Sequence, residues 1–176
     1  QASGTDYMHL YYNNAVATDA KNVTGVWDAN YQTVWHLHGD FQDATSNNVD
    51  ATNYGSTDAT GLFGDGQDLD GTDDYIESSL PSFLTDIGTN DFTVEFVFNA
   101  DNVQSQSTRL RLFDIDDDFD EFTQLVFDDA AAGKLTFVVE DNGVQRSVAV
   151  DTNISAGTWY HAVGVWDASA DAVAVG

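Results

Sequence analysis

The sequence GLFGDGQDLDGTDDYI, which runs from Gly61 to Ile76, places glycines and aspartates between short apolar positions and then enters an alternating segment at Tyr75. Glycine adopts backbone conformations that other residues avoid, and aspartate accepts hydrogen bonds within turns. The pattern therefore predicts a strand, a tight turn and a second strand. A helix would need apolar residues every three to four positions, and no long segment of the chain has that spacing.

The rest of the chain repeats this alternation of short apolar runs and turns rich in Asp, Asn and Gly. Such regular spacing is typical of a β-sandwich. One hairpin is expected to turn at residues 141–143, where Asn-Gly favours a tight reversal. In the strand expected at residues 91–99, the apolar side chains share one face. Strands are also predicted at residues 7–12, 110–115, 122–127, 134–140, 144–150, 159–166 and 172–175.

The charge of the chain is strongly negative. Its 176 residues include 30 acidic and 5 basic ones, which give a formal net charge of −25. Nucleic acid is excluded as a partner, because phosphate binding needs clustered Lys and Arg. The acidic excess is almost all aspartate, with 26 Asp against 4 Glu, which agrees with an all-β fold rich in turns. Two interpretations remain open: a solvated surface in a saline setting, or an excess that in part binds divalent cations.

Hydrophobic residues make up 42% of the chain, so a single domain of this length can bury a core. No apolar run is long enough for a membrane-spanning helix, and none is predicted. The chain has no cysteine, which excludes disulfides, thiolate metal sites and cysteine catalysis.

Three segments resemble known extracellular domains. LDGTDDYI at residues 69–76 and TWYHAVGVWDASADAVAVG at residues 158–176 resemble laminin G-like domains of the concanavalin A-like jelly-roll superfamily. HLYYNNAVATDAKNVTGVWDANYQTVWHLHGD at residues 9–40 resembles the tail of a small domain that commonly precedes such modules in microbial surface proteins. The resemblance implies an antiparallel β-sandwich jelly roll at residues 39–176, preceded by a segment at residues 1–38 that packs as an edge strand. It also implies an extracellular or cell-surface location.

The resemblance also concerns the two ends of the chain. Related domains continue with further strands beyond the position of Gly176, and the strand expected at residues 7–12 lacks its usual preceding domain. Unpaired backbone groups at a strand edge are readily taken up by another strand, so we expect one terminal segment to pair with a neighbouring copy or with chain beyond this sequence. The apolar residues expected at that contact are Leu10, Tyr12, Val173 and Val175.

A candidate calcium site combines two loops that related jelly rolls place close together. The loop at residues 39–50 resembles a D-x-S/T-G-N-G-N-D element, and residues 71–75 match a G-x-D-D-Y element. Calcium takes six to eight oxygen ligands, which Asp and Asn loops supply. The alternative is that the aspartates only cap turns by accepting backbone N–H bonds. The four ligand residues that the resemblance implies are Asp43, Asn47, Asp73 and Asp74.

A second acidic motif occupies residues 114–121. Asp114, Asp116 and Asp118 have the spacing of the first three ligands of a calcium loop, but Phe119 stands where such a loop needs glycine. The pattern therefore favours a charged loop between strands.

His36 and His38 lie two positions apart and could bind a transition metal from one strand face. They alternate with Trp35 and Leu37 in a segment that resembles a packing element of the family. A structural role, with ring nitrogens satisfied by the backbone, is therefore favoured.

No catalytic motif is present. Jelly-roll glucanases carry E-x-D-x-x-E on one strand, and none of the four glutamates begins that motif. No Ser-His-Asp order, phosphate-binding loop or zinc motif occurs either. We therefore expect that the protein is not an enzyme.

Two functions remain. The first is a non-catalytic recognition or adhesion module that binds a glycan or a surface protein, with calcium in its loops. The second is a structural subunit of an extracellular fibre or surface layer that self-assembles through strand edges. Aromatic side chains that could stack on sugar rings are Tyr7, Tyr11, Tyr12, Trp27, Tyr31, Tyr54 and Trp166, although most aromatics of a sandwich lie in the core.

Overall fold

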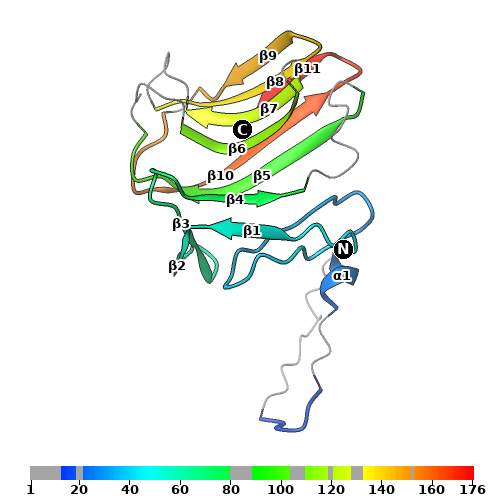
Figure 1. Ribbon diagram of the computed structural model, residues 1–176, viewed down its shortest axis with the longest axis vertical. Coiled ribbons are helices and arrows are strands. Elements are labelled where there is room, and N and C mark those ends of the chain that lie inside the picture. The colour runs from blue at the N-terminus through cyan, green and yellow to red at the C-terminus, as the bar shows by residue number, and fades with distance from the viewer. Residues whose placement is uncertain are drawn as a thin grey trace, which may run out of the picture.

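The computed structural model describes residues 13–18, 22–79, 89–103, 110–118, 121–127, 133–151 and 153–176 (Figure 1). Within these ranges the chain forms antiparallel strands and a single short helix, α1 (Val23–Val26). This confirms the all-β class. The strand predicted at residues 7–12 lies outside the described residues.

The largest sheet of the described chain has four antiparallel strands. They are β6 (Leu110–Asp118), β7 (Glu121–Phe127), β8 (Leu135–Asp141) and β9 (Val144–Ala149), in that spatial order. The predicted hairpin joins β8 to β9, and its turn residues Asn142 and Gly143 have φ angles of 49° and 72°. Two consecutive left-handed residues characterise the tight turn that Asn-Gly favours.

A second sheet has three strands in the order β11-β10-β5. They are β5 (Phe92–Asn99), β10 (Trp159–Asp167) and β11 (Ala172–Val175). The predicted apolar face of β5 is confirmed, because its buried and half-buried side chains alternate with exposed ones. On β11, Val173 and Val175 pack against the core, whereas Ala172 and Ala174 are exposed. The two valines predicted at an intermolecular contact therefore face the interior of their own chain.

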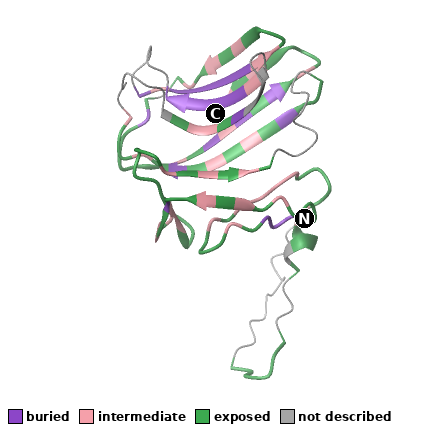
Figure 2. Ribbon diagram, viewed as in Figure 1, coloured by how far each residue is buried: buried purple, intermediate pink, exposed green. Residues whose placement is uncertain are grey.

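The core lies between these two sheets, and Figure 2 shows the buried segments gathered in their strands. The rings of Phe98 and Phe127 meet edge to face with centroids 6.0 Å apart, and those of Phe92 and Phe137 meet at 6.4 Å. Gly164 permits a close approach of the two sheets, because a Cβ there would lie 2.7 Å from Cδ2 of Phe137. The two sheets thus form the predicted antiparallel sandwich.

Two small sheets lie beside the sandwich in Figure 1. β1 (Ala51–Tyr54) pairs with β4 (Tyr75–Ser78), and β2 (Thr57–Thr60) pairs with β3 (Asp65–Asp68). The strands predicted around residues 61–76 are therefore present, but β3 and β4 belong to different sheets. The tight turn expected between them is instead a loop at residues 69–74, which its own aspartate side chains stabilise.

The prediction for the acidic run at residues 114–121 was wrong. We expected a charged loop, but β6 extends through Asp118 and β7 begins at Glu121. The reason is alternation: Phe113 and Ile115 face the core while Asp114 between them is exposed, so acidic residues fit one face of a strand. Register irregularities in the ladder accommodate the chain on either side of this segment.

The N-terminal segment is only partly described. The side chain of Asn22 caps α1 by accepting a hydrogen bond from the N–H of Gly25 at 3.0 Å. Trp35 then forms an isolated antiparallel bridge with Asp43. In the described part of the chain, no helix has the length and apolar character needed to cross a membrane.

Candidate functional site

Three aspartates gather in the loop between β3 and β4. One carboxylate oxygen from each of Asp70, Asp73 and Asp74 lies within 4.8 Å of the others. The loop folds back on itself because Asp70 accepts a hydrogen bond from the N–H of Thr72 at 2.7 Å, and Asp74 accepts one from the N–H of Asp70 at 3.0 Å. Gly71, between them, has a φ of 74°. Closely spaced carboxylates of this kind supply the oxygen ligands that hard cations prefer.

Asp74 is held against the end of β1. A Cβ on Gly55 would overlap Oδ1 of Asp74, and Gly55 has a φ of 101°, so both space and backbone conformation require glycine there. This contact fixes the carboxylate that leads directly into β4. The acidic loop is therefore attached to the small β1–β4 sheet.

Asp43 has a different environment. Its Oδ1 accepts hydrogen bonds from the N–H groups of Val34 and Thr45, each at 2.9 Å. Its Oδ2 accepts from the hydroxyl of Thr45 at 2.7 Å and from the N–H of Val49 at 3.0 Å. Burial alone raises the pKa of Asp43, but the four hydrogen bonds outweigh burial and lower the pKa below its ordinary value of 3.8. Asp43 organises its loop in the manner of the turn-capping alternative.

The side chain of Asn47 also stabilises the loop in which it lies. Its side-chain amide donates hydrogen bonds to the carbonyl oxygens of Tyr31 at 3.2 Å and Gln32 at 2.8 Å. These bonds tie the loop to the preceding segment of the chain.

The predicted metal residues therefore fall into two groups. The N–H of Asp43 donates to Asp50, which immediately precedes β1, whereas Asp74 contacts Gly55, which immediately follows β1. The four residues of β1 lie between these points, which are five residue steps and therefore roughly 17 Å apart. The structure brings Asp73 and Asp74 together with Asp70, and Asp43 is not part of that group, while the side-chain amide of Asn47 bonds to the carbonyls of Tyr31 and Gln32. Sequence analysis did not select Asp70, although its place in D-G-x-D-D was the available signal.

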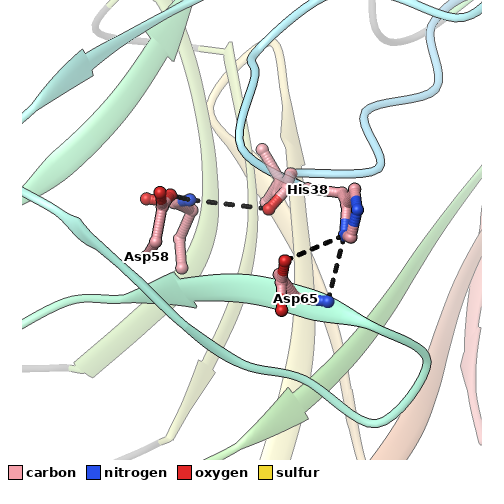
Figure 3. Close-up of polar contacts among 5 residues, drawn as sticks. His38, Asp58 and Asp65 are labelled. Atoms are coloured by element: carbon pink, nitrogen blue, oxygen red, sulfur yellow. Dashed lines mark hydrogen bonds and ion pairs between the residues drawn. The ribbon is translucent and has the colours of Figure 1, made fainter.

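His38 of the histidine pair has a backbone partner. Figure 3 shows His38 on a loop beside the β2–β3 hairpin, where its Nδ1 accepts a hydrogen bond from the N–H of Asp65 at 3.0 Å. Gln67 of the same hairpin donates to Asp58 at 2.7 Å and to the carbonyl of Leu37 at 3.5 Å. This hydrogen bond from the backbone to the His38 ring agrees with the structural role that was predicted.

The predicted aromatic platforms divide by exposure. Trp166 is only 2% exposed and belongs to the core, so it cannot stack on a ligand. Tyr54 is exposed and stacks on Tyr75 of the neighbouring strand, with centroids 4.5 Å apart and an interplanar angle of 13°. Tyr31 is exposed as well and lies against Trp27, with centroids 4.8 Å apart. Residues 7, 11 and 12 lie outside the described chain.

Sequence and structure comparisons agree with this fold. Residues 70–175 match the sequence profile of a laminin G family described as "Concanavalin A-like lectin/glucanases superfamily". The match begins at Asp70 and so includes the three clustered aspartates. No curated protein sequence matches the chain significantly.

A solved structure is also similar. It is the 2.1 Å crystal structure of residues 221–444 of an S-layer domain-containing protein from Clostridium thermocellum ATCC 27405. The two chains are 20% identical, with a TM-score of 0.52, and the similarity covers 76% of this chain and 67% of that one. At this identity the likeness concerns the fold.

Proposed function

Because the chain belongs to the concanavalin A-like lectin/glucanase superfamily, we propose that it is a non-catalytic recognition module of an extracellular microbial surface protein, which binds a glycan or a protein. The observation that carries the proposal is the three-aspartate loop beside an exposed aromatic pair on β1 and β4. These groups stand outside the core and have no role in holding the two main sheets together. The absence of an E-x-D-x-x-E motif from the sequence supports binding without hydrolysis.

Calcium dependence is part of the proposal. Asp73 and Asp74, together with Asp70, offer up to six carboxylate oxygens in one loop. Backbone carbonyls and water would complete the six to eight ligands that calcium requires. Asp43 and Asn47 shape the loop at the opposite end of β1 and do not need to contact the ion.

The proposal is tested by a binding screen with the whole chain. Purified cell-wall glycans and surface proteins are titrated in millimolar calcium and in chelator. Saturable binding to a defined ligand supports a recognition module. Absence of saturable binding under both conditions contradicts it.

The alternative is a structural subunit of an extracellular fibre or surface layer. It is favoured by apolar side chains on the outer face of the three-stranded sheet, where Val97 is 46% exposed and Trp159 and Val165 are each 37% exposed. In the described chain, β5 and β11 are the end strands of that sheet and leave edges for another strand. The similar solved structure comes from an S-layer domain-containing protein. Sedimentation velocity over increasing protein concentration tests this alternative, because a subunit of an array must associate and a recognition module need not.

A further inference from the structure

One face of the β1–β4 sheet is fully uncovered. The two strands alternate in register, so that Ala51, Asn53, Ile76 and Ser78 are half-buried on one side. The opposite side consists of two cross-strand pairs, Thr52 with Glu77 and Tyr54 with Tyr75, and all four residues are exposed. Tyr54 is 43% exposed and Tyr75 is 50% exposed. We name this surface the β1–β4 face.

A shallow depression lies further along the same two strands. It has a volume of about 340 Å³ and is lined by Asp50, Thr52, Glu77, Ser78 and Ser79. Every lining side chain is a carboxylate or a hydroxyl. The pair Thr52–Glu77 lies two residues along the strands from the tyrosine pair, a separation of roughly 7 Å. The β1–β4 face thus combines an aromatic platform, which is the outer face of the stacked tyrosine pair, with a polar pocket roughly 7 Å away along the strands.

The platform is held in place from behind. Asn53, on the half-buried side of β1, donates to the carbonyl of Ser56 at 2.8 Å, and its Oδ1 accepts from the hydroxyl of Ser56 at 2.7 Å. Ser56 also contacts Gln67 of the β2–β3 hairpin at 2.9 Å. A surface fixed in this way loses little conformational freedom when a ligand binds.

We propose that the β1–β4 face binds an uncharged pyranose chain, with one sugar ring against the outer face of the stacked Tyr54–Tyr75 pair and the hydroxyls of the next bonded in the Asp50–Glu77 pocket. The inference rests on the proposed recognition function and assigns its ligand class and its location. Aromatic rings offer apolar faces to the C–H side of a sugar, and carboxylates accept hydrogen bonds from its hydroxyls. The hydroxyls of Thr52 and Ser79 both donate and accept, which matches sugar hydroxyls better than the ammonium and guanidinium groups of a cationic peptide, which only donate.

Charge decides between classes of glycan. Asp50 and Glu77 line the pocket, Asp74 precedes Tyr75, and no Lys or Arg lies in the pocket. The chain as a whole carries a formal charge of −25. A sulfated or uronic-acid chain would place anions against these carboxylates, so such ligands are disfavoured.

The test is titration of the chain with neutral oligosaccharides of glucose, galactose, mannose and N-acetylglucosamine at about 0.15 M salt, with heparin and polylysine as charged comparators. Each titration is made in millimolar calcium and repeated in chelator, so that any dependence on calcium is measured separately from the choice of sugar. We expect saturable binding of at least one neutral oligosaccharide. Tyr75→Ala and Glu77→Ala should each weaken it about tenfold or more, whereas Tyr75→Phe, which keeps the ring, should bind nearly as well as wild type.

Tyr31→Ala is the matched control, because Tyr31 is similarly exposed at 48% and also lies in an aromatic pair. Thermal melting of each variant verifies that it is folded. Unchanged neutral-sugar binding in Tyr75→Ala and Glu77→Ala would overturn this location and leave the recognition function standing. Binding of heparin or polylysine alone, or of no oligosaccharide, would overturn the ligand class. The recognition function itself fails only if the wider screen of cell-wall glycans and surface proteins also yields no saturable ligand.

Discussion

Thr45 bonds to both carboxylate oxygens of Asp43, donating its backbone N–H to Oδ1 at 2.9 Å and its hydroxyl to Oδ2 at 2.7 Å. Both residues are buried, with exposed fractions of 7% for Asp43 and 1% for Thr45. The same carboxylate accepts the N–H groups of Val34 and Val49, so one side chain joins three separate backbone positions. The loop that leads into β1 therefore depends on a single ionised group.

Replacing Asp43 by alanine should destabilise the fold. The substitution leaves the N–H groups of Val34, Thr45 and Val49 without their acceptor, and a buried unpaired donor is costly. We expect the free energy of unfolding, measured with urea, to fall by about 2–4 kcal/mol. Asp40→Ala is the control, since Asp40 is exposed and accepts only one long bond of 3.3 Å from Gln42. Equal effects of the two substitutions would contradict the role assigned to Asp43.

The lowered pKa of Asp43 predicts a pH dependence. In the unfolded state the Asp43 carboxylate binds a proton near the ordinary pKa of 3.8, and in the folded state it binds the proton only at lower pH. The contribution of Asp43 is therefore complete above that value and is lost as pH falls below 3.8 toward the folded pKa. The difference in unfolding free energy between wild type and Asp43→Asn should be constant at neutral pH and shrink in acid.

This difference isolates Asp43 from other acidic groups. The pKa of Asp167 is also lowered, chiefly because its carboxylate accepts a hydrogen bond from the hydroxyl of Ser169, but that group is present in both proteins. Urea unfolding at a series of pH values from acid to neutral supplies the measurement. A difference that stays constant through the acid range would show that the hydrogen bonds do not favour the ionised form.

Calcium should stabilise the protein through the three-aspartate loop. An ion that binds only the folded state adds roughly 2.7 kcal/mol when its concentration is a hundredfold above Kd. Thermal melting in millimolar calcium and in chelator, at fixed ionic strength, measures this gain. Asp73→Asn is the preferred variant, because Asp73 lies in the cluster while the hydrogen bonds that shape the loop come from Asp70 and Asp74.

We expect Asp73→Asn to lose most of the calcium-dependent gain in melting temperature and to melt like wild type in chelator. Asp141→Asn, in the distant β8–β9 hairpin, should keep the full gain. If calcium raised the melting temperature of wild type and Asp73→Asn equally, the cluster would not be the binding site.

The main sandwich followed from the sequence because its signals are local. Alternation on β5 identified its core face, and Asn142-Gly143 specified the turn between β8 and β9. Pairing between distant segments has no such signal. The partner of β4 is β1, some twenty residues earlier in the chain. The aspartates after β3 are compatible with a tight turn and with a longer loop. The strand was predicted only as far as Ile115, because the following residues Asp116–Asp118 offer no apolar position that continues the alternation of Phe113, Asp114 and Ile115.

The candidate site was predicted only in part, for a related reason. Asp73 and Asp74 were chosen from a motif, and their neighbour Asp70 was passed over although backbone folding within the loop brings it to them. Asp43 has the residue type of a calcium ligand, but its oxygens are committed to hydrogen bonds that depend on the positions of Val34 and Val49. Those positions are set by tertiary structure and not by spacing along the chain.

Gly164→Ala should destabilise the sandwich. The added methyl group would lie 2.7 Å from the ring of Phe137, which is itself completely buried and cannot move aside. Overpacking of this kind costs about 1–3 kcal/mol. Gly66→Ala is a matched control in a strand, because a Cβ there would meet its nearest neighbour at 3.7 Å. Urea unfolding should rank the two variants clearly, and a Gly164→Ala protein as stable as Gly66→Ala would mean that the two sheets are not packed this closely.

Monovalent salt should stabilise the protein without any specific site. Thirty acidic residues against five basic ones repel one another across a small surface, and unfolding relieves that repulsion by moving the charges apart. The Debye length falls from roughly 30 Å at 0.01 M to 3 Å at 1 M salt, so the repulsion is progressively screened. We expect the melting temperature in sodium chloride and chelator to rise over this range.

Replacing the exposed Asp101 and Asp151 by asparagine should slightly reduce the rise of the melting temperature with salt concentration, because fewer charges remain to be screened. A melting temperature that does not change with sodium chloride would mean that the carboxylates are already compensated within the fold, which would contradict a freely solvated acidic surface.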